Sequence, residues 1–226
     1  VLKQRHVQAV VARWLQRDMA TASIHNYLSF LRTFAGWIGR PGLVREVAFY
    51  VGADSPHVHR KQVAVEDRSW TAHGVDIEAK IAEVAAFDPW VSLQLEICYR
   101  FGARPKEARH FRPHGALIPR ELAFERDAAA YPECEEFVRF AQGTKGGRPR
   151  DEPLQTEEQR ELLTRLQTIV AKGWYVGQPG RTAAQNQDRF YNVLRRFGIT
   201  RAALGVTAHG LRHQSANDGY EADTGA

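Results

Sequence analysis

Several features that would assign the chain to particular protein classes are absent from its 226 residues. Its two cysteines, Cys98 and Cys134, form neither a disulfide framework nor a metal-binding spacing. No apolar run approaches the roughly 18 residues that indicate a membrane span, and no signal-peptide pattern opens the chain. Internal repeats and low-complexity runs are also missing. We therefore expect a soluble, globular protein of the reducing cytoplasm, without a membrane partner, a bound metal or a cofactor.

The charge balance is mildly basic. The chain contains 31 Lys or Arg and 26 Asp or Glu, which gives a formal charge of +5 and a pI near 9.4. Such an excess favours a polyanionic partner, although a single basic cluster is equally typical of a solvated surface. The basic residues gather in three clusters, formed by Arg104, Lys106, Arg109 and Arg112, by Lys145, Arg148 and Arg150, and by Arg189, Arg195, Arg196 and Arg201.

The first part of the chain has the apolar periodicity of helices. Apolar residues from Val7 to Leu15 recur at the helical period and predict a first helix. A second helix is expected to begin after Thr21 as its N-cap and to end at Gly39. Further short helical pieces are expected between residues 43 and 65, so this region is predicted to be a small helical bundle.

The polar segment 66–76 is the expected boundary between two domains, residues 1–66 and 67–226. His57 and His59, just before this segment, have the spacing of a metal-binding pair. No carboxylate cluster accompanies them, so loop histidines are the favoured interpretation and no metal site is expected.

Helices with clear start signals are also predicted in the second domain. One is expected from about Asp76, and Asp88 followed by Pro89 begins another that is apolar on all sides, as a buried central helix is. Thr156 and Thr182 each begin a capping box. Between these helices the pattern changes, and short strands are expected at residues 115–119, 121–124, 136–142 and 148–154, with a glycine-rich turn at 143–147.

The most informative stretch runs from Thr207 to Asp218. With Thr207 as the N-cap, spacings of three and four place His209, Arg212 and His213 on one face of a helix. In the first turns of a helix, free amide groups and the helix dipole favour an anion. The stretch therefore suggests phosphate binding, although a His and an Arg one turn apart are also common on a solvated helix face.

Two basic motifs precede this stretch. Arg104 follows Gly102 directly after the apolar helix, and Glu107 comes one turn later, where it would fix the guanidinium or form an ordinary surface pair. Lys145 lies in the glycine-rich turn of a predicted hairpin, from which a long side chain can enter a DNA groove. The turn that begins at Gly143 is not a nucleotide-binding P-loop, because no G-K-[ST] sequence follows a strand here.

In this order, the motifs resemble those of the tyrosine recombinases, the phage integrase family of site-specific DNA recombinases. That family carries a first arginine in a G-x-R-x-x-E run, a lysine on a β-hairpin, and then H-x-L-R-H. Here these are Arg104, Lys145 and the run from His209 to His213. The resemblance implies a fold that is mainly α with a small antiparallel β-sheet. Residues 1–66 would be a SAM-like core-binding helical bundle, and residues 67–226 a mixed α+β catalytic domain.

The resemblance also implies the chemistry, which is cutting and rejoining of DNA through a 3′-phosphotyrosyl intermediate. Arg104 and Arg212 would neutralise the phosphorane-like transition state, and Lys145 would protonate the leaving 5′ oxygen. His209 would donate a hydrogen bond to the phosphate or help to deprotonate the attacking tyrosine. Glu107 and His213 would support these groups. Direct DNA contacts are expected from Lys106, Arg148, Arg150, Arg195 and Arg196.

The implied partner is double-stranded DNA, with a homo-oligomer that becomes a tetramer in synapsis and a nucleoid-associated location. In the family, the nucleophilic tyrosine lies well beyond the H-x-L-R segment, and Tyr220 follows Arg212 too closely to be that residue. We therefore expect a C-terminally truncated catalytic domain, inactive alone, with its nucleophile beyond Ala226.

Two alternatives remain open from the sequence. The first is a noncatalytic DNA-binding relative that lacks the nucleophile. The second is a helical DNA-binding module in which the motif matches are accidental. The second alternative predicts that the four motif residues do not converge in space, namely Arg104, Lys145, His209 and Arg212.

Overall fold

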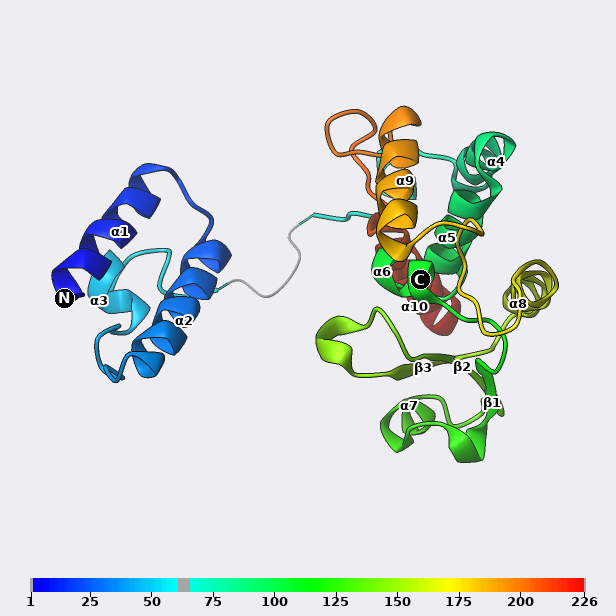
Figure 1. Ribbon diagram of the computed structural model, residues 1–226, viewed down its shortest axis with the longest axis horizontal. Helices are drawn as coiled ribbons and strands as arrows, with labels where there is room; N and C mark the ends of the chain where they lie inside the picture. The colour runs from blue at the N-terminus through cyan, green and yellow to red at the C-terminus, as the bar shows by residue number, and fades with distance from the viewer. Residues whose placement is uncertain (1, 61–65, 226) are drawn as a thin grey trace. The chain divides into compact units, whose positions relative to one another are not determined.

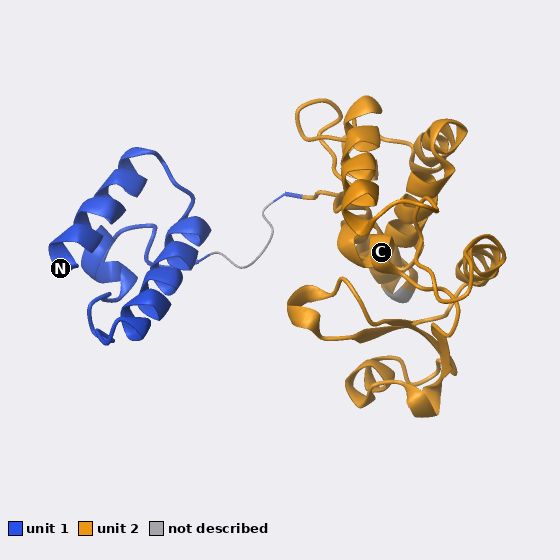
Figure 2. Cartoon of the chain, in the orientation of Figure 1, with its two compact units in different colours: residues 1–66 blue, residues 67–226 orange. Residues whose placement is uncertain are grey.

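The computed structural model describes residues 2–60 and 66–225. The chain forms two compact units, residues 1–66 and residues 67–226 (Figure 2). The division falls at the start of the polar segment in which the sequence predicts a boundary. None of the helices in the described residues is both long enough and apolar enough to cross a lipid bilayer.

The N-terminal unit is helical. Val7 and Val11 of the first helix pack against Ile24 and Leu28 of the second in a small core. Thr21 is not the N-cap of the second helix, as the sequence predicts, but its first residue, and Ala20 holds the cap position. The helices of this unit are α1 (Gln4–Gln16), α2 (Thr21–Trp37) and α3 (Val47–Val51) (Figure 1).

The Thr21 hydroxyl lies 2.9 Å from Nδ1 of His57, so the interaction that it makes is tertiary rather than a helix cap. The carbonyl oxygen of His57 lies 2.9 Å from Nε2 of His25, within hydrogen-bond distance. Of the helical pieces expected between residues 43 and 65, α3 lies within the described residues, and residues 61–65 lie outside them.

The second unit is built around the helix that begins at Pro89. Asp88 caps this helix, because its Oδ1 accepts hydrogen bonds from the backbone N–H groups of Trp90 and Val91. Leu95, Ile97 and Cys98 of the helix are fully buried, and it contacts five other helices. The helices described here are α4 (Ile77–Phe87), α5 (Pro89–Arg100), α6 (Pro105–His110), α8 (Glu157–Ile169), α9 (Ala183–Arg196) and α10 (Gly210–Thr224).

A three-stranded antiparallel sheet in the order β1-β2-β3 completes this unit (Figure 1). Val138 and Phe140 of the middle strand belong to the helical core, whereas the alternate residue Phe137 packs on the other face with Ile118. The strands and the helix that covers this second face are β1 (Leu117–Pro119), β2 (Glu136–Phe140), β3 (Arg150–Pro153) and α7 (Glu125–Ala130). The predicted mainly helical fold with a small antiparallel sheet is confirmed.

The prediction of a strand at residues 121–124 is wrong. A short 3-10 turn, Arg120–Leu122, and the start of α7 occupy this region. The Arg120 guanidinium donates to three carbonyl groups of residues 128–134, and the backbone N–H of Phe124 donates to Asp151 at 2.8 Å. These tertiary hydrogen bonds close the segment into a turn, which apolar alternation alone does not reveal.

Candidate functional site

A buried carboxylate, Glu107, lies at the centre of the candidate site. It is on the first turn of α6 and is 0% exposed. Its Oε1 accepts from Nη1 of Arg104 at 2.7 Å, and its Oε2 accepts from the Arg104 backbone N–H at 2.7 Å. Nη2 of Arg150, at the start of β3, lies 3.2 Å from the same Oε2. Glu107 therefore fixes two guanidinium groups from different elements and is not an ordinary surface pair.

The charge of Glu107 is maintained by these neighbours. Burial alone would raise the pKa of the Glu107 carboxyl, because desolvation disfavours the charged form. The hydrogen bond from the Arg104 backbone and the nearby guanidinium groups of Arg150 and Arg104 outweigh burial, and the pKa lies below its ordinary value. The carboxylate is therefore ionised at neutral pH and holds both arginines in a defined orientation.

Arg212 reaches the same place from α10. Its Nη1 donates to the carbonyl of Gly102, a residue 110 positions earlier in the chain, and Nη2 of Arg150 lies 3.5 Å from that carbonyl. Gly102 has a φ of +52°, and an added Cβ would lie 3.2 Å from Oγ of Ser215. A glycine here allows both the left-handed turn and the close approach of α10. The pKa of Arg212 is lowered by burial and by the charges of Arg150 and Arg104.

His209 lies at the start of α10, although not as the sequence predicts. It is the N-cap of α10, which begins at Gly210, so Thr207 does not cap this helix. The carbonyl of Thr207 instead accepts from the Gly210 backbone N–H at 2.8 Å and from Nε1 of Trp70 at 2.9 Å. The rings of His209 and His213 meet edge to face with centroids 5.3 Å apart.

Positive charge surrounds the His209 ring. Its pKa is lowered, first by burial and then by the charges of His213, Arg212, Arg104 and Arg68. An anion bound among these groups would offset that repulsion and raise the pKa again. His209 is therefore positioned to take up a proton when an anion enters the site.

This coupling gives a first prediction. Sulfate should bind more tightly as the pH falls below the ordinary imidazole pKa of 6.5, because sulfate keeps its charge while the imidazole gains one. We expect the NMR titration of the His209 ring to shift to higher pH when sulfate is added. The His209→Gln variant should lose most of the pH dependence but still bind sulfate. A His209 titration that is unchanged by sulfate would contradict an anion site at this position.

Lys145 is not in contact with the arginines. It lies in the exposed 3-10 turn Lys145–Gly147 between β2 and β3, and its side chain makes no hydrogen bond or ion pair with the described residues. The base of its loop does pack on α6, since a Cβ added to Gly143 would lie 2.5 Å from the carbonyl of Lys106. The loop thus starts against Lys106, which follows Arg104 by two residues in the chain, while the Lys145 side chain is exposed to solvent.

The residues predicted to contact DNA fall into two groups. Lys106 and Arg148 are exposed, and so are Arg195 and Arg196 on α9. Arg150 differs, because it is paired with Glu107 and Glu152 inside the site. Sequence reasoning missed this role, which depends on the strand register that pairs Arg150 with Phe140 beside the end of α5. Arg68, which contributes to the field at His209, was also missed, and no sequence signal identifies it.

Taken together, the guanidinium groups of Arg104, Arg150 and Arg212 lie around Glu107, and Glu152 pairs with Arg150. The His209 ring lies beside Arg104 and Arg212, and we call this set of residues the Glu107 cluster. Nε and Nη2 of Arg104 and of Arg212 have no hydrogen-bond partner in the described part of the chain. Planar guanidinium groups with free donors suit bidentate contacts to a phosphate. The site is therefore suited to bind and neutralise an oxyanion.

The described residues contain no group of three or more His, Cys, Asp or Glu side chains suited to a metal ion. None of the tyrosine hydroxyls in residues 2–60 and 66–225 is hydrogen-bonded to Arg104, His209 or Arg212.

Comparisons with protein-family models, with curated proteins and with solved structures found no match to this chain.

Proposed function

We propose that the protein is a site-specific DNA recombinase of the tyrosine type, and that the Glu107 cluster holds the DNA phosphate at which a strand is cut and rejoined. The observation that carries the proposal is the meeting of Arg104 with His209 and Arg212, which belong to a second motif far along the chain. Accidental matches to these two motifs would not be expected to bring the three residues together.

The proposed chemistry uses each group according to its place. Transfer of a phosphoryl group requires neutralisation of the charge that develops on the equatorial oxygens, and the fixed guanidiniums of Arg104 and Arg212 supply this. His209 donates a hydrogen bond to the same phosphate. Lys145 is the proposed general acid for the leaving 5′ oxygen, and its loop closes over the DNA from its base on α6.

The nucleophile of this mechanism is a tyrosine hydroxyl, which forms a 3′-phosphotyrosyl intermediate that keeps the bond energy. Tyr220 does not fit this role, because it lies eight residues beyond Arg212, about 12 Å along α10. We therefore propose that the nucleophile is a tyrosine other than Tyr220.

The distribution of charge supports DNA as the partner. Residues 1–66 contain nine Lys or Arg and four Asp or Glu, a formal charge of +5, whereas residues 67–226 contain 22 of each. The whole net charge of the protein thus belongs to the N-terminal unit. We propose that this unit is a core-binding domain that grips double-stranded DNA, that the protein forms a tetramer in synapsis, and that it acts at the nucleoid.

Salt dependence tests the DNA partner. Anisotropy of a labelled duplex should show affinity falling by on the order of 10³-fold between about 50 and 200 mM salt, because phosphate contacts release counterions. Replacing Arg13 of α1 and Arg17, the residue that follows this helix, with Gln should flatten the slope, whereas the same change at Glu121 and Glu125 should not. A salt-independent affinity would contradict any role in binding DNA.

The absence of a tyrosine contact at the described site favours one alternative, a noncatalytic relative that binds DNA without cutting it. This alternative predicts the same salt dependence and the same anion site. It differs in one respect, since it predicts that no covalent link to DNA forms. The covalent adduct is therefore the experiment that separates the two functions.

A further inference from the structure

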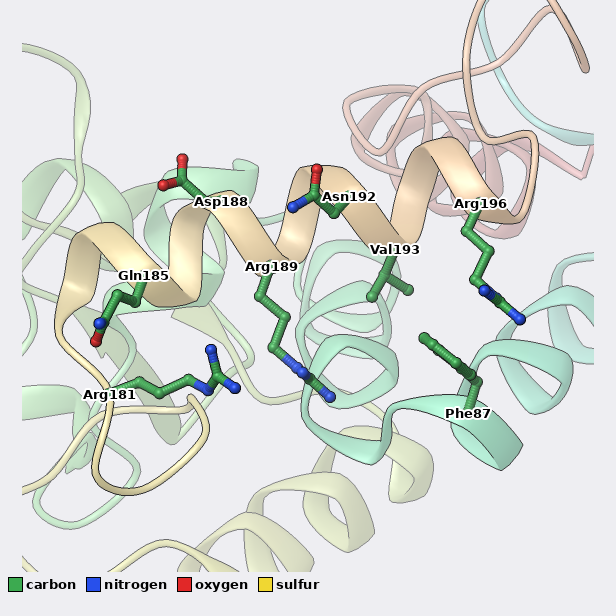
Figure 3. A pocket seen from close by; sticks show the side chains of 8 residues that line it. All are labelled: Phe87, Arg181, Gln185, Asp188, Arg189, Asn192, Val193 and Arg196. Atoms are coloured by element: carbon green, nitrogen blue, oxygen red, sulfur yellow. The ribbon is translucent and has the colours of Figure 1, made fainter.

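A groove lies along α9 and shares no lining residue with the Glu107 site. Its volume is about 440 Å³, within the range of small-molecule sites. It is lined by one face of α9, by Arg181 just before that helix, and by Phe87 at the end of α4 (Figure 3). Nothing in the proposed recombination chemistry uses this groove.

One end of the groove carries two converging arginines. In Figure 3 the Arg181 guanidinium points toward that of Arg189, and Asp188 contributes one acidic side chain to the lining of the groove. Nε of Arg189 pairs with the fully buried Asp88 at 2.5 Å, which orients its terminal nitrogens. The Arg181 side chain has no acidic partner among the described residues. This end therefore has one guanidinium oriented by Asp88 and a second whose donors are free in the described residues.

The backbone that carries Arg181 is held in place. Its carbonyl accepts from the Tyr175 hydroxyl at 3.2 Å. Asn186 of α9 accepts from the backbone N–H of Gln178 at 3.0 Å and donates to the carbonyl of the same residue at 3.3 Å. Thr182 then opens α9 through a capping box. An irregular loop with this number of fixed contacts loses little entropy when a ligand binds to it.

The other end of the groove is flat and aromatic. The Arg196 guanidinium lies over the Phe87 ring at 4.3 Å from its centroid, and Phe87 remains 47% exposed. Stacked guanidinium planes and exposed aromatic rings are surfaces on which nucleobases stack. Arg189 and Arg196 are seven residues apart on α9, so the two ends are about 10 Å apart along the helix.

We propose that the α9 groove binds a nucleotide, with its phosphate on Arg181 and Arg189 and its base against Arg196 and Phe87. Inorganic phosphate would bind the two arginines at the first end but would not occupy the flat end. An acidic peptide would pair with the arginines but has no aromatic base to stack on the flat end. The nucleotide is either a free mononucleotide or an unpaired residue of a nucleic acid strand, and both present the same chemistry to this groove. This proposal does not depend on the recombinase function.

Isothermal titration calorimetry on the whole chain tests the proposal. The probes are 5′-AMP, a single-stranded tetranucleotide, inorganic phosphate and hexaglutamate. We expect 5′-AMP or the tetranucleotide to bind at least tenfold more tightly than phosphate and hexaglutamate. Tighter binding of 5′-AMP would identify a free nucleotide as the ligand, and tighter binding of the tetranucleotide would identify a strand. Equal binding of hexaglutamate, or no binding of either nucleotide probe, would overturn the proposal.

Variants locate the binding in the groove. Arg181→Gln should weaken nucleotide binding about tenfold through the phosphate, and Arg196→Gln should weaken it through the base. Arg201→Gln is the matched control, because Arg201 is an exposed arginine outside the groove, and it should have no effect. Arg189 is kept, since its loss would leave the buried carboxylate of Asp88 without its cationic partner. Equal losses in Arg201→Gln and Arg181→Gln would mean nonspecific attraction and would also overturn the proposal.

Discussion

Replacement of Arg212 by Ala is expected to reduce covalent adduct formation with DNA by at least about 10²-fold, while DNA affinity stays within a few fold. The reason is that Arg212 would contribute most when charge develops on the phosphate, whereas many other contacts hold the DNA. The measurement is a denaturing gel with a nicked duplex, on which the protein as its source cells make it is compared with the Arg212→Ala variant.

Two controls accompany this prediction. The Arg201→Ala variant removes an exposed arginine of the same unit and should retain full adduct formation. Because Arg212 also donates to the Gly102 carbonyl, the melting temperature of each variant is measured to exclude unfolding. If adduct and DNA binding are lost to the same extent in a folded Arg212→Ala protein, Arg212 is merely a DNA contact.

The second large effect is expected from Glu107→Ala, which should lower the free energy of unfolding by about 3 kcal/mol. The fully buried carboxylate is the acceptor for two guanidiniums and for the Arg104 backbone N–H. Its removal leaves the Arg104 guanidinium without an acidic partner among the described residues and leaves Arg150 paired with Glu152 alone. Arg104 and Arg150 are partly solvated, which keeps the cost at the lower end of the range for buried pairs. Urea denaturation of both proteins measures the difference.

A matched control distinguishes this role from that of an ordinary ion pair. Glu78 pairs with Arg100 in the same unit but is largely exposed, so Glu78→Ala should cost under about 1 kcal/mol. The depressed pKa of Glu107 adds a pH test, because its stabilisation is full above the ordinary carboxyl pKa and is lost as the pH falls through the folded value. A Glu107→Ala cost no larger than that of Glu78→Ala would contradict the central role of Glu107.

Local signals predicted the helices well. Asp88 with Pro89, Thr156 and Thr182 all start helices where the sequence places them, because a cap and its helix are neighbours in the chain. The errors arise where distant residues intervene. Thr21 is engaged by His57, and the carbonyl of Thr207 is engaged by Trp70, so neither is an N-cap.

At the candidate site, too, the sequence predicted what local motifs specify and missed what depends on distant contacts. The motifs identified Arg104, His209 and Arg212, and these residues meet at the candidate site. The sequence did not reveal that Arg150 pairs with Glu107, because this depends on the register of β2 and β3. It also could not place the Lys145 side chain, which has no packing partner that would fix it among the described residues.

The central claim is that the Glu107 cluster holds a phosphate at which DNA is cut by a tyrosine. The most direct test incubates the protein, as its source cells make it, with a duplex nicked near the cleavage position, and then identifies any DNA-linked peptide by mass spectrometry. The account predicts a tyrosine joined to a 3′-phosphate, formed without a metal ion or ATP. Firm binding of the duplex without any covalent peptide would contradict it and would favour a noncatalytic DNA-binding protein.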